Sequence, residues 1–115
     1  MALPQRSIAL SAAVIPLAAT AIKQEVRRDL RLRILQILAD VPAGLTNVHV
    51  LKRALREVGH AVSTDLLRGE LAWLQEQGFV ELGQPAAILI AQLTERGQDI
   101  GSGTAQHLDV SPATD

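Results

Sequence analysis

The sequence predicts a single, mainly α-helical domain that carries a small β-hairpin, and three observations support this fold class. Hydrophobic residues make up 48% of the 115 residues but only Trp73 and Phe79 are aromatic, so Leu, Ile, Val and Ala must build the core, as in packed helices. Apolar residues recur at helical spacing in three segments between residues 23 and 77. After Gly78 the spacing of the apolar residues is no longer helical, and the short apolar runs that follow indicate two short strands.

The first predicted helix covers residues 23–40. Its apolar residues form one stripe at spacings of three and four, with Leu35 beside it: Val26, Leu30, Ile34, Ile37 and Leu38. Charged residues occupy the opposite face, where pairs such as Glu25 with Arg28 add a few tenths of a kcal/mol at most. Pro42 and Gly44 then end the helix.

Thr46 or Asn47 can cap the second predicted helix, which runs to about Val58. Its inner face consists of Val48, Leu51, Ala54, Leu55 and Val58. Its outward residues are Lys52, Arg53 and Arg56. Gly59 suits the left-handed position that follows a helix, and Val62 is expected to reach the core.

The third predicted helix spans about residues 64–77, with Ser63 or Thr64 as its N-cap. Its buried line consists of Leu67, Leu71 and Leu74. Gly78 closes the helix, and Phe79 supplies the apolar contact expected after such a cap. The stretch from residue 59 to residue 78 therefore has the pattern of a helix-turn-helix.

Two short strands are expected next, over residues 79–82 and 87–93, joined by a Gly-Gln-Pro connection. Thr94 can cap a short last helix, which a Gly-Ser-Gly run ends. The folded domain thus covers residues 23–103. Residues 104–115 lack apolar periodicity and are expected to be a flexible C-terminal tail.

Residues 1–22 form an apolar N-terminal arm with no charge from Ser7 to Ile22. This run is shorter than the ~20 apolar residues that a membrane-spanning helix needs, and Pro16 lies inside it. We expect the arm to pack on the domain or on a partner subunit. Two alternatives are a secretory signal, with residues 1–21 removed, and sequence included by an upstream start codon.

The order helix, helix, turn, helix, two-stranded wing, helix is that of a winged helix-turn-helix. Residues 34–101 resemble small ArsR-like winged-helix proteins of Mu-like transposable phages and prophages. The motifs that carry the resemblance are Arg33-Ile34-Leu35, Val62-Ser63-Thr64-Asp65, Leu71-Ala72-Trp73-Leu74-Gln75-Glu76-Gln77-Gly78 and Leu93-Thr94-Glu95-Arg96-Gly97. The resemblance implies a transcriptional regulator that docks its third helix in the major groove of double-stranded DNA and its wing on the backbone.

Six residues are candidates for nucleic-acid binding: Lys52, Arg53, Thr64, Arg68, Gln75 and Gln84. Arg68 can reach a guanine edge and Thr64 a phosphate. Lys52 and Arg53, on the preceding helix, can contact the backbone. The turn at Gln84 can touch the adjacent minor groove.

The charge distribution along the sequence argues against DNA binding. The third helix offers Arg68 among Asp65, Glu70 and Glu76, and the wing has no basic residue. Residues 23–56 carry eight basic and three acidic side chains, a net of +5, whereas residues 57–115 carry two basic and nine acidic ones, a net of −7. The alternative is a winged-helix protein–protein interaction or dimerisation module with little DNA affinity.

Catalysis, metals and cofactors are not predicted. Cysteine is absent, and His49, His60 and His107 fall on three different elements, so we expect surface or capping histidines and no metal response. The sequence has no Gly-rich phosphate loop and no nucleophile elbow, and Ser63 serves as a helix cap. The chain is therefore not expected to be an enzyme.

The expected partners are double-stranded DNA and a second copy of the chain. Trp73, at the edge of the leucine line, is expected to cover that edge, or to mark a partner surface if it is exposed. The basic first half of one copy can also face the acidic half of another. We expect a cytoplasmic homodimer that does not enter the membrane, with the N-terminal arm as its candidate interface.

Overall fold

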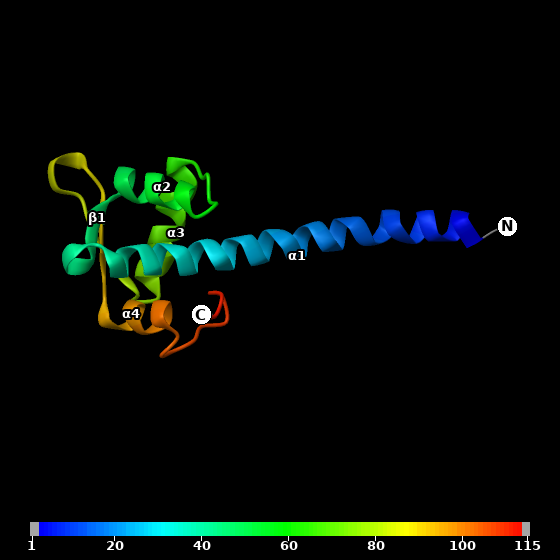
Figure 1. Cartoon of the computed structure of the whole chain (residues 1–115). Coiled ribbons are helices and arrows are strands. Elements are labelled where there is room, and N and C mark those ends of the chain that lie inside the picture. Colours follow the sequence, from blue (N-terminus) through cyan, green and yellow to red (C-terminus); the bar gives the residue numbers. More distant parts are fainter. Residues whose placement is uncertain (1–2, 114–115) are drawn as a thin grey trace.

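The computed structural model describes the backbone of residues 3–113 and the side chains of residues 18–113. Within this range the chain forms four α-helices, two short 3₁₀ turns and one antiparallel sheet (Figure 1). The helices are α1 (Leu3–Asp40), α2 (Val48–Glu57), α3 (Thr64–Glu76) and α4 (Glu95–Ser102). The strands are β1 (Leu45–Asn47), β2 (Val80–Gly83) and β3 (Ile90–Leu93), and the 3₁₀ turns are Pro42–Gly44 and Pro85–Ala87.

Helix α1 differs most from expectation. The predicted helix of residues 23–40 and most of the predicted arm of residues 1–22 form one continuous helix, which passes through Pro16. Its N-terminal half projects away from the domain (Figure 1), so the molecule measures 66 × 31 × 25 Å. The described side chains of the arm, residues 18–22, are exposed and do not pack on their own domain.

The core lies where α1, α2 and α3 meet the sheet and α4. It contains the predicted leucines of all three helices, including Leu38, Leu51 and Leu67, each with no exposed surface. Two predicted core residues are wrong. Val26 is 51% exposed because it precedes the part of α1 that the domain covers, and Val58 is 44% exposed because it lies beyond the last turn of α2.

Helix boundaries follow the predicted caps. The side-chain oxygens of Asn47, Ser63 and Thr94 accept hydrogen bonds from backbone N–H groups of α2, α3 and α4. Gly59 and Gly78 have φ values of +94° and +81°, a region that glycine enters without a steric penalty. The predictions for these five positions are confirmed.

The sheet has the strand order β1-β3-β2, and all pairs are antiparallel. Strands β2 and β3 form the predicted hairpin, or wing, from Val80↔Leu93 to Gly83↔Ile90. Strand β1 was not predicted, because three residues are too few to show the alternation of apolar and polar residues that is typical of a strand. The second hairpin strand begins at Ile90 and not at Ala87, since the preceding 3₁₀ turn holds Ala86 and Ala87 at positive φ.

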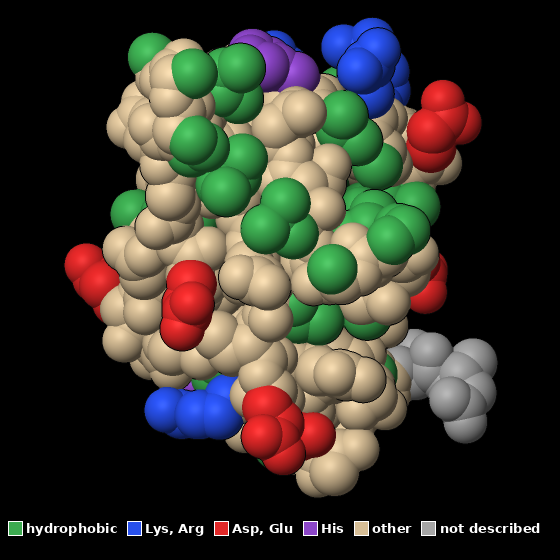
Figure 2. Space-filling model, turned by 90° about the vertical axis from the view of Figure 1, so that its left-hand side faces the viewer, with side chains coloured by type: hydrophobic (Ala, Val, Ile, Leu, Met, Phe, Trp, Pro, Cys, Tyr) green, Lys and Arg blue, Asp and Glu red, His purple; other side chains and the backbone are tan. Residues whose placement is uncertain are grey.

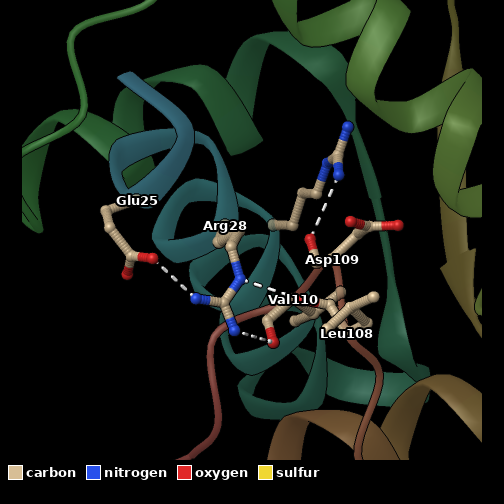
Figure 3. Close-up of polar contacts among 6 residues, drawn as sticks. Glu25, Arg28, Leu108, Asp109 and Val110 are labelled. Atoms are coloured by element: carbon tan, nitrogen blue, oxygen red, sulfur yellow. Dashed lines mark hydrogen bonds and ion pairs between the residues drawn. The ribbon is translucent and has the colours of Figure 1, made fainter. Parts of the chain in front are cut away.

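The segment that follows α4 is not a loose tail over its described part, residues 104–113. Val110 is only 2% exposed, and the N–H of Ser111 donates to the carbonyl of Arg28 over 3.1 Å. The Arg28 guanidinium donates to the Leu108 and Val110 carbonyls and pairs with Glu25 (Figure 3). Residues 104–113 are thus held largely through their own backbone groups. Such contacts do not depend on a repeating pattern of apolar residues, so the sequence gives no sign of them.

The close packing of α4 on the chain around Phe79 gives a stability prediction. A methyl group on Gly97 would lie 2.0 Å from the Phe79 carbonyl oxygen, so Gly97→Ala should lower the free energy of unfolding by about 3 kcal/mol. The control is Gly69→Ala, because a methyl group there meets nothing within 4 Å and should raise stability by up to ~1 kcal/mol. Urea denaturation measures both, and equal stability of the two variants would contradict this packing.

Candidate nucleic-acid interface

The exposed face of α3 is the surface that a helix-turn-helix presents to DNA. It lies opposite the buried leucines Leu67, Leu71 and Leu74. The exposed residues on this face are Asp65, Arg68, Gly69, Ala72, Gln75 and Glu76, with Thr64 half-buried at the start, whereas the exposed Leu66 lies on the flank toward α1. Arg68 lies in the second turn of this face and has no ion-pair partner among the described residues.

Helix α2 places basic residues beside the start of α3. The Lys52 ammonium donates to the Thr64 hydroxyl over 3.2 Å, so these two candidates share one position at the junction of the two helices. Arg53 and Arg56 are exposed and form no ion pair within residues 18–113. The junction therefore presents several cations that are free to meet phosphates.

Glu70 does not belong to this surface. It is only 8% exposed, and its carboxylate lies 2.6 Å from Arg31 Nε and 3.4 Å from Arg27 Nε. The prediction that Glu70 is one of the acids of the third helix that oppose DNA is therefore wrong. Its spacing from Leu67 and Leu74, three and four residues, already places it on the buried face.

Arg31 completes a buried polar cluster with Glu70. Its guanidinium lies 3.7 Å above the centre of the Trp73 ring and donates to the Asp109 carbonyl over 3.1 Å. Trp73 is half-buried and packs against the core, which agrees with its predicted role of covering the core edge. The arginines of α1 between residues 27 and 33 form their ion pairs within the chain, with Glu25, Asp29 and Glu70.

The wing offers little to a phosphate backbone. Its tip, residues 84–88, is exposed throughout and carries no charge. Figure 2 shows this end of the molecule, with hydrophobic side chains spread over the upper part of the face, where the wing and α2 lie. Gln75, predicted to face DNA, accepts a hydrogen bond from the Leu82 N–H over 2.8 Å. Its carbonyl oxygen thus braces the wing against α3, whereas Gln84 is exposed at the tip.

His60 and His107 have structural partners, whereas His49 has none among the described residues. Surface or capping histidines were expected, but the side chain of His60 is buried: the residue is 8% exposed, and its Nε2 lies 2.7 Å from Asp29 Oδ2. His107 makes edge contacts with the rings of Trp73 and Phe79, with centroids 5.4 and 5.6 Å apart. His49 is exposed at the start of α2. Within residues 18–113 no three His, Asp or Glu side chains gather as metal ligands would.

Comparison with known proteins gives two relatives and a structural neighbour. The chain is 38% identical over 78 residues to the uncharacterized protein gp26 of Escherichia phage Mu, covering 68% of this chain and 80% of gp26. It is 33% identical over 76 residues to an uncharacterized protein of Haemophilus influenzae, covering 64% of this chain and 72% of that protein. No model of a known protein family matches the sequence.

Among solved structures, a mutant of Lactococcus lactis ZitR in its apo form aligns with a TM-score of 0.50. The alignment covers 89% of this chain and 69% of ZitR at 16% identity, so it shows a likeness of fold alone. This likeness, with the element order, confirms the predicted winged helix-turn-helix. None of the helices in the described part of the chain is long and apolar enough to cross a membrane.

The buried pair of Arg31 and Glu70 gives a second stability prediction. Glu70→Gln leaves the Arg31 charge buried without its counter-ion, and we expect it to lower the free energy of unfolding by about 3 kcal/mol. Glu76→Gln, on the exposed face of the same helix, should change it by less than ~0.5 kcal/mol. Urea denaturation measures both; a Glu70→Gln variant as stable as Glu76→Gln would show that the pair does not hold α3 on α1.

Proposed function

The chain belongs to the family of the phage Mu protein gp26, and we propose that it binds double-stranded DNA as a transcriptional regulator of a phage, a prophage or their bacterial host. The observation that carries the proposal is the burial of Glu70 against Arg31. This burial keeps the Glu70 carboxylate away from the exposed face of α3. Arg68 is left exposed on that face, beside the cations of α2. The proposal agrees with the function that the resemblance to ArsR-like proteins implies. Its site of action is the bacterial cytoplasm.

Each residue of the interface has a proposed role. Arg68 reads a guanine edge in the major groove, since the guanidinium matches its two acceptors. Thr64 and Lys52, already in contact over 3.2 Å, bind a phosphate at the start of α3. Arg53 and Arg56 bind phosphates further along the same strand. Gln84 reaches the minor groove from a wing tip that adds no charge.

The electrostatic balance predicts modest affinity. The outer surface of the helix-turn-helix carries four basic residues, Lys52, Arg53, Arg56 and Arg68, against three acidic ones, Glu57, Asp65 and Glu76. Non-specific affinity arises largely from neutralised phosphates. Selective binding therefore depends on Arg68 more than on the general attraction of the surface to DNA.

We further infer that the binding unit is a homodimer. One α3 helix reads only a few base pairs, whereas two helices related by a two-fold axis read two half-sites. A dimer also doubles the number of cations that meet phosphates. The modest charge of one protomer makes this doubling important for binding at physiological salt.

A protein-binding module remains the second candidate function, on one observation. Leu45 of β1, Val50 of α2 and Ile88 of the neutral wing tip are 40%, 37% and 47% exposed, and Figure 2 shows hydrophobic side chains exposed at this end of the molecule. Such a surface suits an apolar contact with another protein better than a phosphate backbone. If DNA is not bound, this face is the first place to look for a partner.

A gel shift with mixed-sequence duplex DNA at low salt tests the proposed function. We expect binding by the wild-type chain, loss of sequence preference in Arg68→Ala, and uniformly weaker binding to all sequences in Arg53→Ala. Arg96→Ala is the matched control, because Arg96 is exposed but lies on α4, away from the interface. Absence of a shift at low salt, or an equal effect of all three substitutions, would contradict the proposal.

A further inference from the structure

The projecting half of α1 creates a groove with no occupant. Residues 18–27 are all exposed, although Ile22 and Val26, at 61% and 51% exposure, are apolar. Between this part of α1 and the start of α3 lies a hollow of about 330 Å³. Its apolar lining consists of Ile22, Val26, Leu30, Val62 and Leu66.

The helix beside this groove needs a partner to be stable. A helix without tertiary contacts is marginal in water, since most helical stability in proteins comes from packing. Residues 7–22 carry no charge, so they add no ion pairs that would stabilise an isolated helix. An apolar projecting helix next to an apolar groove indicates that both are covered in the working molecule.

The described part of the chain does not cover this groove. Helix α1 is continuous from Leu3 to Asp40, and its N-terminal half leads away from the domain (Figure 1). Leu3 to Arg27 spans 25 residues, or about 37 Å at the rise of an α-helix. An uncharged helix can enter the groove only from another molecule, and each copy of this chain carries one.

We propose that two copies pair through antiparallel α1 helices, with the uncharged segment of each lying in the groove lined by Ile22, Val26 and Leu66 of the other. Because this segment has no charge, it enters an apolar groove without burying an unpaired ion. The charged side chains that rim the groove, Lys23, Arg27 and Glu70, stay at its edge. The projecting halves can overlap over about 20 residues, or between five and six helical turns, and each turn places one or two side chains against the partner.

This inference rests on the proposed homodimer but not on DNA binding, and its test contains no DNA. Light scattering of the full-length wild-type chain at micromolar concentration should give the mass of a dimer. Ile22→Glu and Leu66→Glu, on the two walls of the groove, should each raise the dissociation constant at least tenfold. Leu108→Glu is the control, because Leu108 is apolar and 85% exposed but lies outside the groove, and it should leave the dimer unchanged.

Cross-linking tests the antiparallel arrangement. The chain has no cysteine, so a single introduced thiol reports one position. Ala19→Cys lies on the same helical face as Ile22 and Val26 and should form a disulfide-linked dimer on mild oxidation, whereas Gln24→Cys, on the opposite face, should not. A monomeric wild type, a dimer that survives both groove substitutions, or equal cross-linking of the two thiols would overturn the inference. Failure of the gel shift alone would overturn the DNA proposal and leave this one standing.

Discussion

Arg31 is the residue on which the arrangement of the domain depends. From α1 it pairs with Glu70 of α3 over 2.6 Å, lies 3.7 Å from the centre of the Trp73 ring, and donates to the Asp109 carbonyl. One buried guanidinium therefore joins α1, α3 and the C-terminal segment. Together with the buried leucines of α3, this contact sets the orientation of α3 relative to α1 and hence the face that α3 exposes.

The same contact changes the meaning of the charge pattern. In the sequence, a basic first half and an acidic second half suggest that the two halves attract each other or a second copy. In the structure part of this attraction is used within the chain, because Glu70 pairs with Arg27 and Arg31 of α1. The cations of α2 and Arg68 are left for an outside partner, and the surface around α3 is less acidic than the sequence suggests.

The local chemistry of the helix-turn-helix could be predicted from the sequence, because caps and leucine spacing act over a few residues. Asn47, Ser63 and Thr94 cap the helices as expected. The long-range features could not be predicted. The C-terminal segment is held by hydrogen bonds to its backbone carbonyls, which any residue type provides. Of the candidate DNA-binding residues, Gln75 uses its side-chain oxygen to hold the wing, a contact that no sequence period reveals.

In the proposed complex the four cations of α2 and α3 meet DNA phosphates, and the internal pairing of Glu70 keeps its carboxylate away from this surface. The most direct test is the salt dependence of DNA affinity, measured by fluorescence anisotropy between low and physiological salt. Neutralisation of about four phosphates per protomer predicts a log–log slope of roughly −3 to −4 for each protomer bound. A slope near zero, with or without measurable binding, would contradict the claim and favour the protein-binding function.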